Sequence, residues 1–263
     1  MISKEEKCLH FSSFLLFLWS FMFDRVIEDI VLEDFASAKV LFQEGIPFYD
    51  VSAFTLKEAC QQYQIDYYSL EKKLVQNHTA SIPDQATSIE DILCYLTESH
   101  RTFIKQSLPY YSNLIENSCV SQFEDQQVAK DLQFIFPLFV EDFIRHVLEE
   151  EKTMFRYITT LIEASNKQSS LSKAYMLMQQ KSIASFALDH LHDDPLEGIR
   201  KLTKNYAFSE RATVHEKVVM YELQQFDKDL LLHAKIEDQL LFSKALVIEQ
   251  KVKQAVNTST SLN

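Results

Sequence analysis

The chain has 263 residues, only two glycines, five prolines and a formal net charge of −12. Glycine averages about 7% of residues in proteins, and β-hairpins and tight βα turns depend on its positive φ. Its scarcity excludes β-sandwiches, barrels and Rossmann units, and Gly45 and Gly198 are too far apart to form a phosphate-binding loop. The acidic balance excludes nucleic acid as a partner, because a phosphate backbone requires a concentrated basic surface. We therefore predict an all-α protein.

Residues 1–21 form an apolar extension whose role the sequence leaves open. Two lysines precede an apolar run from Phe11 to Phe23, as in a signal peptide, but no small-residue cleavage site follows. The run is too short for a transmembrane helix, so we expect no membrane partner. The alternatives are a dispensable extension ahead of a start at Met22, a packed helix, or a segment for export or anchoring.

The cysteines show neither a CxxC spacing nor the density of a disulfide framework. The four are Cys8, Cys60, Cys94 and Cys119. We expect buried thiols in a reducing compartment.

Residues 22–77 are predicted to form a small helical N-terminal domain. Thr55 and Glu58 have the spacing of a capping box at the start of one of its helices. The polar segment 78–87 contains a proline and is predicted to be a linker.

Residues 88–252 are predicted to form a four-helix bundle, because long amphipathic helices in one chain normally bury their apolar stripes against each other. The four amphipathic stretches lie near 88–117, 122–164, 171–193 and 210–252. Pro109 and Pro137 lie inside the first two and are expected to kink or break them. A short helix is expected around 195–205, and a disordered tail over 253–263.

One pattern, F-x2-D-x3-H-x3-E-x4-F, occurs on both the second and the fourth stretch. Its copies are Phe139, Asp142, His146, Glu150 and Phe155, and Phe226, Asp229, His233, Glu237 and Phe242. In each copy the histidine and the glutamate continue an apolar stripe and are spaced i, i+4, so that both can bind one ion. Burying a carboxylate without a paired charge or an ion is costly. We therefore interpret these residues as metal ligands rather than as core histidines satisfied by a neighbouring carboxylate.

The other two stretches carry further candidate ligands. His100 continues the apolar stripe of the first stretch, between Leu96 and Phe103. On the third stretch, periodicity favours His190, while His192 lies about 200° around the helix and stays an alternative. The three remaining histidines are expected to be solvated: His10, His78 and His215. The predicted metal ligands are thus His100, His146, Glu150, His190 or His192, His233 and Glu237.

A histidine from each helix and two glutamates suit a site for two metal ions, with the glutamates bridging. Imidazole with carboxylate suits iron, manganese or zinc, and two-metal sites in helix bundles are most often di-iron centres. The H-x3-E spacing differs from the Glu-x-x-His of ferritin-like bundles, and the excess of imidazole makes the site hemerythrin-like. Asp142 and Asp229, one turn before the histidines, either orient them or are simply solvated.

From these residues the sequence resembles the repair-of-iron-centres proteins, a family of hemerythrin-like di-iron proteins with a small N-terminal domain. The resemblance covers roughly residues 22–250. It is carried by His146-Val-Leu-Glu-Glu-Glu-Lys-Thr-Met-Phe155, Asp229-Leu-Leu-Leu-His233-Ala-Lys-Ile-Glu237-Asp-Gln-Leu-Leu-Phe242, Ile199-Arg-Lys-Leu-Thr-Lys-Asn-Tyr206, Ser-Leu-Pro at 107–109, Glu44-Gly-Ile-Pro-Phe48 and Thr55-Leu-Lys-Glu-Ala-Cys60. It implies a cytoplasmic protein that helps restore iron–sulfur clusters damaged by nitric oxide or peroxide, with damaged iron–sulfur proteins as partners. His146, Glu150, His233 and Glu237 would bind two iron ions, the glutamates bridging.

The sequence departs from the family pattern at three places. The first ligand histidine of the family falls at Arg101, one position after His100. The third helix is shorter, so either His190 or His192 could match the family's histidine. A cysteine pair that the family usually carries is replaced by Tyr49 and Asp50, so thiol chemistry of that pair is absent.

Three hypotheses follow. The first is a di-iron stress-response protein that repairs iron–sulfur clusters, either by delivering iron or by binding and reducing nitric oxide. The second is a hemerythrin-like sensor or carrier of oxygen or nitric oxide without repair activity. The third is a bundle without metal that acts as a dimerising scaffold, and the chain could form a homodimer. No Ser-His-Asp or Cys-His arrangement for nucleophilic catalysis is evident.

Overall fold

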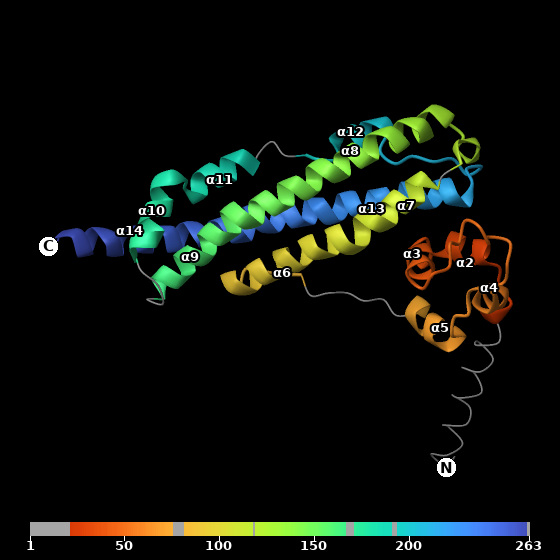
Figure 1. Ribbon diagram of the computed structural model, residues 1–263, viewed down its shortest axis with the longest axis horizontal. Coiled ribbons are helices and arrows are strands. Elements are labelled where there is room, and N and C mark those ends of the chain that lie inside the picture. The colour runs from red at the N-terminus through yellow and green to blue at the C-terminus, as the bar shows by residue number, and fades with distance from the viewer. Residues whose placement is uncertain (1–21, 76–81, 118, 167–170, 191–193, 262–263) are drawn as a thin grey trace, which may run out of the picture. The chain divides into compact units, whose positions relative to one another are not determined.

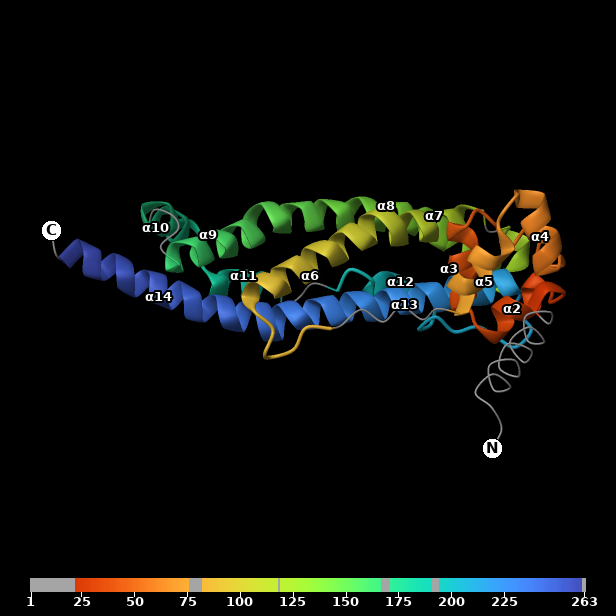
Figure 2. The ribbon, with the colours of Figure 1, turned by 90° about the horizontal axis from the view of Figure 1, so that it is seen from below.

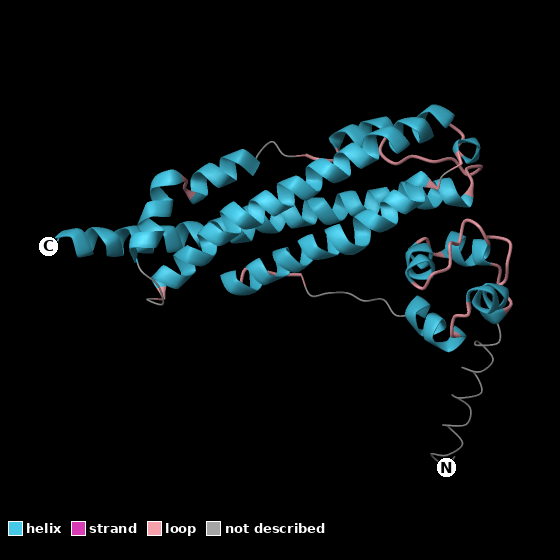
Figure 3. Cartoon of the chain, in the orientation of Figure 1, coloured by secondary structure: helices cyan, strands magenta, loops and turns pink. Residues whose placement is uncertain are grey.

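The computed structural model describes residues 22–75, 82–117, 119–166, 171–190 and 194–261. Within these ranges the chain is built from helices, and Figure 3 shows no strand in them. β-pairing is limited there to an isolated antiparallel bridge between Val26 and Thr55. The predicted all-α class is therefore confirmed. The apolar extension and the predicted positions Cys8, His10, His78 and His192 lie outside the described residues.

The chain divides into two compact units. The first comprises Met1–Thr79, Ser121–Glu124 and Phe208–Glu222, and the second comprises Ala80–Val120, Asp125–Ala207 and Leu223–Asn263. The first unit thus takes in two segments far along the chain from the predicted N-terminal domain of residues 22–77. The predicted boundaries of that domain and of the linker stay a prediction.

Within residues 22–75, the first unit contains four short helices. They are α2 (Ile27–Glu33), α3 (Ala36–Gln43), α4 (Leu56–Tyr63) and α5 (Tyr67–Val75). The predicted capping box is present at the start of α4, where the Thr55 hydroxyl accepts the Glu58 N–H at 3.2 Å. In return, the Thr55 N–H donates to the Glu58 carboxylate at 2.8 Å. Neither N–H group has a backbone acceptor within the helix, so the cap satisfies both and defines where α4 begins.

His215 is buried in the first unit, so the prediction that it is solvated is wrong. Its ring stacks against Phe48 at a centroid distance of 6.2 Å and meets Tyr49 edge-on at 5.1 Å. The neighbouring Glu216 is also buried and accepts the backbone N–H of Glu124 at 3.1 Å. Both residues lie at the start of helix α13 (Val214–Ile236), which is covered by loops distant in sequence. A pattern along one helix does not reveal such contacts.

The second unit is a bundle of four long helical segments (Figures 1 and 2). The first two are α6 (Ile89–Thr102), η1 (Phe103–Ser107) and α7 (Leu108–Glu116), then α8 (Gln126–Glu150), η3 (Glu151–Phe155) and α9 (Arg156–Ser165). The other two are α10 (Leu171–Gln180) with α11 (Ile183–His190), and α13 (Val214–Ile236), η4 (Glu237–Leu241) and α14 (Phe242–Ser261). The residues of α13 up to Glu222 belong to the first unit. The short α12 (Glu197–Leu202) packs against α8. Because α14 packs against α9, α10 and α11, and α7 packs against α8, the predicted bundle is confirmed.

The helices differ from the predicted stretches in three ways. The third stretch breaks between α10 and α11, where the Ser182 hydroxyl accepts the N–H of Ser185 at 3.2 Å and begins a new helix. The second predicted stretch is expected to kink or break at Pro137, but α8 continues through this proline without a break. Pro137 lies on the exposed face of α8. The fourth remains helical to Ser261 instead of ending near residue 252, because no glycine or proline follows to stop it.

Two apolar layers of the second unit leave a polar level between them. One layer is aromatic, with ring centroids between 5.1 and 6.1 Å apart, and comprises Phe103, Tyr111, Phe139, Phe143 and Phe226. The other is mainly aliphatic and includes Ile92, Leu96, Met154, Ile158, Leu161, Ile183, Leu241 and Val252. The histidines and glutamates of the repeated pattern, on α8, α13 and η4, lie between these layers.

Candidate metal centre

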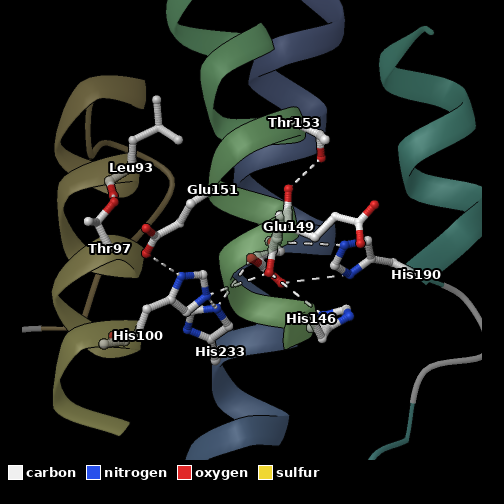
Figure 4. Close-up of polar contacts among 12 residues, drawn as sticks. Leu93, Thr97, His100, His146, Glu149, Glu151, Thr153, His190 and His233 are labelled. Atoms are coloured by element: carbon white, nitrogen blue, oxygen red, sulfur yellow. Dashed lines mark hydrogen bonds and ion pairs between the residues drawn. The ribbon is translucent and has the colours of Figure 1, made fainter. Parts of the chain in front are cut away.

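Four helical segments bring six predicted ligands to this polar level, and Figure 4 labels the histidines among them. The six are His100 of α6, His146 and Glu150 of α8, His190 of α11, His233 of α13, and Glu237 at the start of η4. Together they line a cavity of about 60 Å³. A buried water occupies about 10–15 Å³ of such a volume, so the cavity has room for more than one small ion.

His100, His233 and Glu237 form the first ligand group, with one ligand atom from each within 4.8 Å of the others. The Nε2 atoms of the two histidines are 2.9 Å apart, and His233 Nε2 lies 3.2 Å from Glu237 Oε1. Two donor atoms bound at right angles to one ion, each at about 2.1 Å, would be about 3.0 Å apart. The spacing of the two nitrogens therefore matches adjacent ligands of one metal ion.

Glu150, His190 and Glu237 form the second ligand group, again within 4.8 Å of one another. His190 lies 3.8 Å from Glu237 and 3.9 Å from Glu150. Glu150 Oε2 is also 3.7 Å from His146 Nε2 and 3.6 Å from His100 Nε2. Each glutamate therefore contacts histidines on both sides of the cavity, which is the arrangement expected of bridging carboxylates.

Among the described residues, Glu150 Oε1 and His233 Nδ1 of these groups are buried and find no hydrogen-bond partner. Leaving such atoms unsatisfied costs about 1–3 kcal/mol each. An ion bound to the carboxylate would satisfy the first of them. The donor set of imidazoles and carboxylates therefore fits a metal, and the geometry fits two ions that share Glu237.

Burial sets the protonation of this cavity. It lowers the pKa of His233 to about 4, and burial with the nearby His233 lowers the pKa of His100 to about 4 as well. Burial and the adjacent Glu237 raise the pKa of Glu150 to about 10. At neutral pH the imidazoles of His100 and His233 in the metal-free cavity are therefore neutral, as ligation requires, and Glu150 keeps its proton until a cation replaces it.

His146 lies at the edge of the cavity, with 44% of its side chain exposed, rather than on the buried stripe as predicted. The buried face of α8 passes through Phe136 and Val147, one position away from the predicted Ile135 and His146. A hollow of about 220 Å³, lined by His146, Glu150 and His190 among others, adjoins the centre on this side. His146 and His190, whose ring centroids are 6.0 Å apart, thus stand where the hollow meets the centre.

Three π-helical segments occur close to the candidate ligands. η3 begins directly after Glu150, η4 begins at Glu237, and η1 begins three residues after His100. The Phe242 N–H donates to the Glu237 carbonyl five residues earlier, so the turn contains one more residue than an α-helical turn. This extra residue explains the E-x4-F spacing at the end of the repeated pattern, where an α-helix would favour three or four. π-turns inside α-helices are frequent at functional sites.

The structure also places the residues on which the sequence left alternatives open. His100 is 2% exposed and faces the cavity, whereas Arg101 is exposed and lies 3.6 Å from Glu98. Asp142 is exposed on α8 and lies 3.3 Å from Arg145, which favours solvation over orienting His146. Asp229 is also exposed. Among the described cysteines Cys60 is buried as expected, whereas Cys94 and Cys119 are exposed, and none forms a disulfide.

Sequence reasoning missed two features close to the centre. Glu151 Oε1 lies 3.0 Å from His100 Nδ1, on the side of the ring that faces away from the cavity. Arg200 donates to Asp194 at 2.7 and 3.1 Å, and to Asp227 at 2.9 and 2.6 Å. Asp194 lies shortly after His190 of α11, and Asp227 lies on α13. Arg200 therefore links the segment after α11 to α13. Arg200 lies in a segment that carries the family resemblance, which was the available signal.

No protein-family model matches the chain. The chain is similar to the iron-sulfur cluster repair protein YtfE of Musicola paradisiaca (strain Ech703). The two are 23% identical over 216 residues, which cover 80% of this chain and 90% of that protein. The similarity therefore extends over most of both chains.

None of the described helices is both long enough and apolar enough to cross a membrane.

Proposed function

We propose that this protein uses a di-iron centre to help repair iron–sulfur clusters damaged by nitrosative or oxidative stress. The observation that carries the proposal is the pair of ligand groups that share the buried Glu237. The similarity to a protein named for iron–sulfur cluster repair supports it. The proposal includes a cytoplasmic location and damaged iron–sulfur proteins as partners.

In this proposal His100 and His233 would hold one ion, His190 and His146 would hold the other, and Glu150 and Glu237 would be shared between the two. His190, rather than His192, is the ligand of the third helix. Iron bound here would supply exchangeable ferrous iron for a damaged cluster or a redox centre for nitric oxide.

The protein's own residues prepare the site in three ways. The neutral imidazoles of His100 and His233 present lone pairs, and the two carboxylates would partly offset the charge of the ions. The aromatic layer around Phe143 and Phe226 and the aliphatic layer beyond the centre exclude bulk water. The hollow beside His146 gives small molecules or ions a short route to the second ligand group.

Metal analysis of protein purified without oxygen tests the centre. The wild type should contain about two irons per chain, and the double variant His146→Ala, His233→Ala should lose them. The matched control is Glu149→Ala, Lys235→Ala, which removes two exposed side chains from the same helices, within three residues of the mutated histidines. A well-folded wild type that binds no iron would contradict the proposal.

A repair assay tests the function separately. Iron-loaded protein, added to an iron–sulfur enzyme damaged by nitric oxide or peroxide, should restore its cluster absorbance and activity. The metal-free protein and the double variant should not. Reversible binding of oxygen or nitric oxide without any recovery of the damaged enzyme would instead favour a sensor or carrier.

A further inference from the structure

Three consecutive glutamates of α8 and η3 have different surroundings. Glu150 is buried in the cavity, and Glu149 is exposed. Glu151 is 35% exposed at its side chain and extends to α6, where its Oε1 lies 3.0 Å from His100 Nδ1 (Figure 4). The end of α8 therefore supplies one carboxylate to the cavity, and the start of η3 supplies a second to the back of a histidine that lines it.

The His100 ring is held on three sides. Its Nε2 points into the cavity, 2.9 Å from His233 Nε2 and 3.6 Å from Glu150 Oε2. Its Nδ1 faces Glu151, and its plane stacks on Phe155 with an angle of 5° and a centroid distance of 5.3 Å. Because Phe155 and Glu151 are the last and first residues of η3, the π-turn supplies both contacts.

The contact with Glu151 selects one tautomer of His100. A carboxylate only accepts hydrogen bonds, so the ring must donate its Nδ1–H. The Nε2 of a neutral ring then carries the lone pair that a metal ion needs. In the metal-free protein, the hydrogen bond between the two Nε2 atoms must accordingly be donated by His233.

We propose that Glu151 is a positioning residue of the metal centre: by accepting the Nδ1–H of His100, it aims the Nε2 lone pair of that ring at the ion. The inference rests on the proposed centre, and it makes the two facing histidines unequal. His100 is already in the ligating tautomer, whereas His233 must move its proton from Nε2 to Nδ1. Outer carboxylates of this kind typically change metal affinity by about 10–100-fold when they are removed.

The variant Glu151→Met removes the acceptor while keeping most of the volume, so that water does not take the place of the carboxylate. Glu151→Gln keeps an acceptor oxygen and should restore the orientation. Glu149→Met is the matched control, because it makes the same change in charge and size at an exposed neighbour. Circular dichroism and thermal unfolding establish that each variant is folded.

The first measurement is the tautomer of His100 in the metal-free protein, from long-range proton–nitrogen NMR spectra. The wild type, Glu151→Gln and Glu149→Met should carry the proton on Nδ1, and Glu151→Met should show a mixture or the Nε2–H form. A wild type with the proton on Nε2, or an unchanged tautomer in Glu151→Met, overturns the proposal. The wild-type spectrum tests the predicted Nδ1–H tautomer of His100 even if Glu151→Met does not fold.

The second measurement is the affinity for ferrous iron in competition with a chelator. Glu151→Met should bind the more weakly held iron about 10–100-fold less tightly than the wild type. Glu151→Gln should lie between them, and Glu149→Met should match the wild type. Equal affinities for Glu151→Met and the wild type would overturn the proposal. A wild type without iron would contradict the proposed function, whereas the tautomer measurement would still test Glu151.

Discussion

His100 and His233 lie 133 residues apart in the sequence and face each other with their Nε2 atoms 2.9 Å apart. Both rings are buried, and burial keeps both neutral, so each needs a partner for its inward nitrogen. A single metal ion would replace their mutual hydrogen bond with two coordinate bonds. This geometry makes His100 the better candidate for the first ligand, although the family pattern points to Arg101.

The variants His100→Ala and Arg101→Ala distinguish these two positions. We expect His100→Ala to lower the iron content from about two to about one per chain, because it removes a ligand of the first group. Arg101→Ala should leave the iron content unchanged, since its side chain is exposed and lies 3.6 Å from Glu98. Metal analysis of both proteins, purified side by side without oxygen, is the measurement. Iron loss in Arg101→Ala alone would show that the helix register in solution differs.

Much of the bundle could be predicted because it depends on short-range periodicity. The apolar stripes indicated the helices, and their continuation through His100, His233 and Glu237 indicated which polar side chains face inward. The same argument misplaced His146 by one position, since Ile135 and Phe136 are both apolar and the stripe alone does not choose between them.

Other features depend on contacts that no local pattern contains. The burial of His215 is due to Phe48 and Tyr49, more than 160 residues earlier. The contact between Glu151 and His100 required both the π-turn and the neighbouring helix. The E-x4-F spacing is the signal by which the irregular turn could have been found, because five residues do not return to the same face of an α-helix.

Stability of the metal-free protein should depend on pH through Glu150. Its pKa is raised from the usual 4.5 to about 10, so the stability that this group contributes is full below pH 4.5 and is lost as the pH rises toward 10. His100 and His233 have pKa values lowered from 6.5 to about 4, so their contribution rises with pH in that interval and is constant above it. Between pH 7 and 9, we therefore expect the midpoint of thermal unfolding to fall with pH.

The neutral variant Glu150→Gln tests this origin of the pH dependence. It cannot ionise, so its unfolding midpoint should change less between pH 7 and 9 than that of the metal-free wild type. Glu149→Gln, the exposed neighbour, should behave like the wild type. An equal decline in all three proteins would show that other groups cause it.

The paired carboxylates of Arg200 should contribute to stability unequally. Asp227 is 10% exposed at its side chain and receives two hydrogen bonds from Arg200, so Asp227→Asn should lower the free energy of unfolding by about 1–3 kcal/mol. Asp194 is more exposed, and its loss should have the smaller effect because water can replace the contact. Urea unfolding at pH 7 compares them, with the exposed Glu197→Gln as control. A larger effect for Asp194→Asn would contradict this order.

Glu249 of α14 should anchor the start of α11, the helix that carries His190. Its carboxylate is 3% exposed and accepts the Tyr157 hydroxyl at 2.6 Å and the Ile183 N–H at 3.1 Å, while Lys253 donates to its other oxygen at 2.9 Å. Burial alone would raise its pKa, but the hydrogen bonds from Tyr157, Lys253 and Ile183 outweigh it, so the pKa lies below the usual 4.5.

The lowered pKa of Glu249 gives the sign of the effect. Its contribution is present above pH 4.5 and is lost as the pH falls through the pKa of the folded state. Glu249→Gln should therefore lower the free energy of unfolding by about 1–3 kcal/mol at pH 7, with a smaller difference at pH 4. Urea unfolding at the two pH values measures this, with Gln250→Glu as an exposed control on the same helix. If the difference in free energy of unfolding between the wild type and Glu249→Gln is the same at both pH values, the charge of Glu249 does not contribute. Glu249 would then act through packing alone.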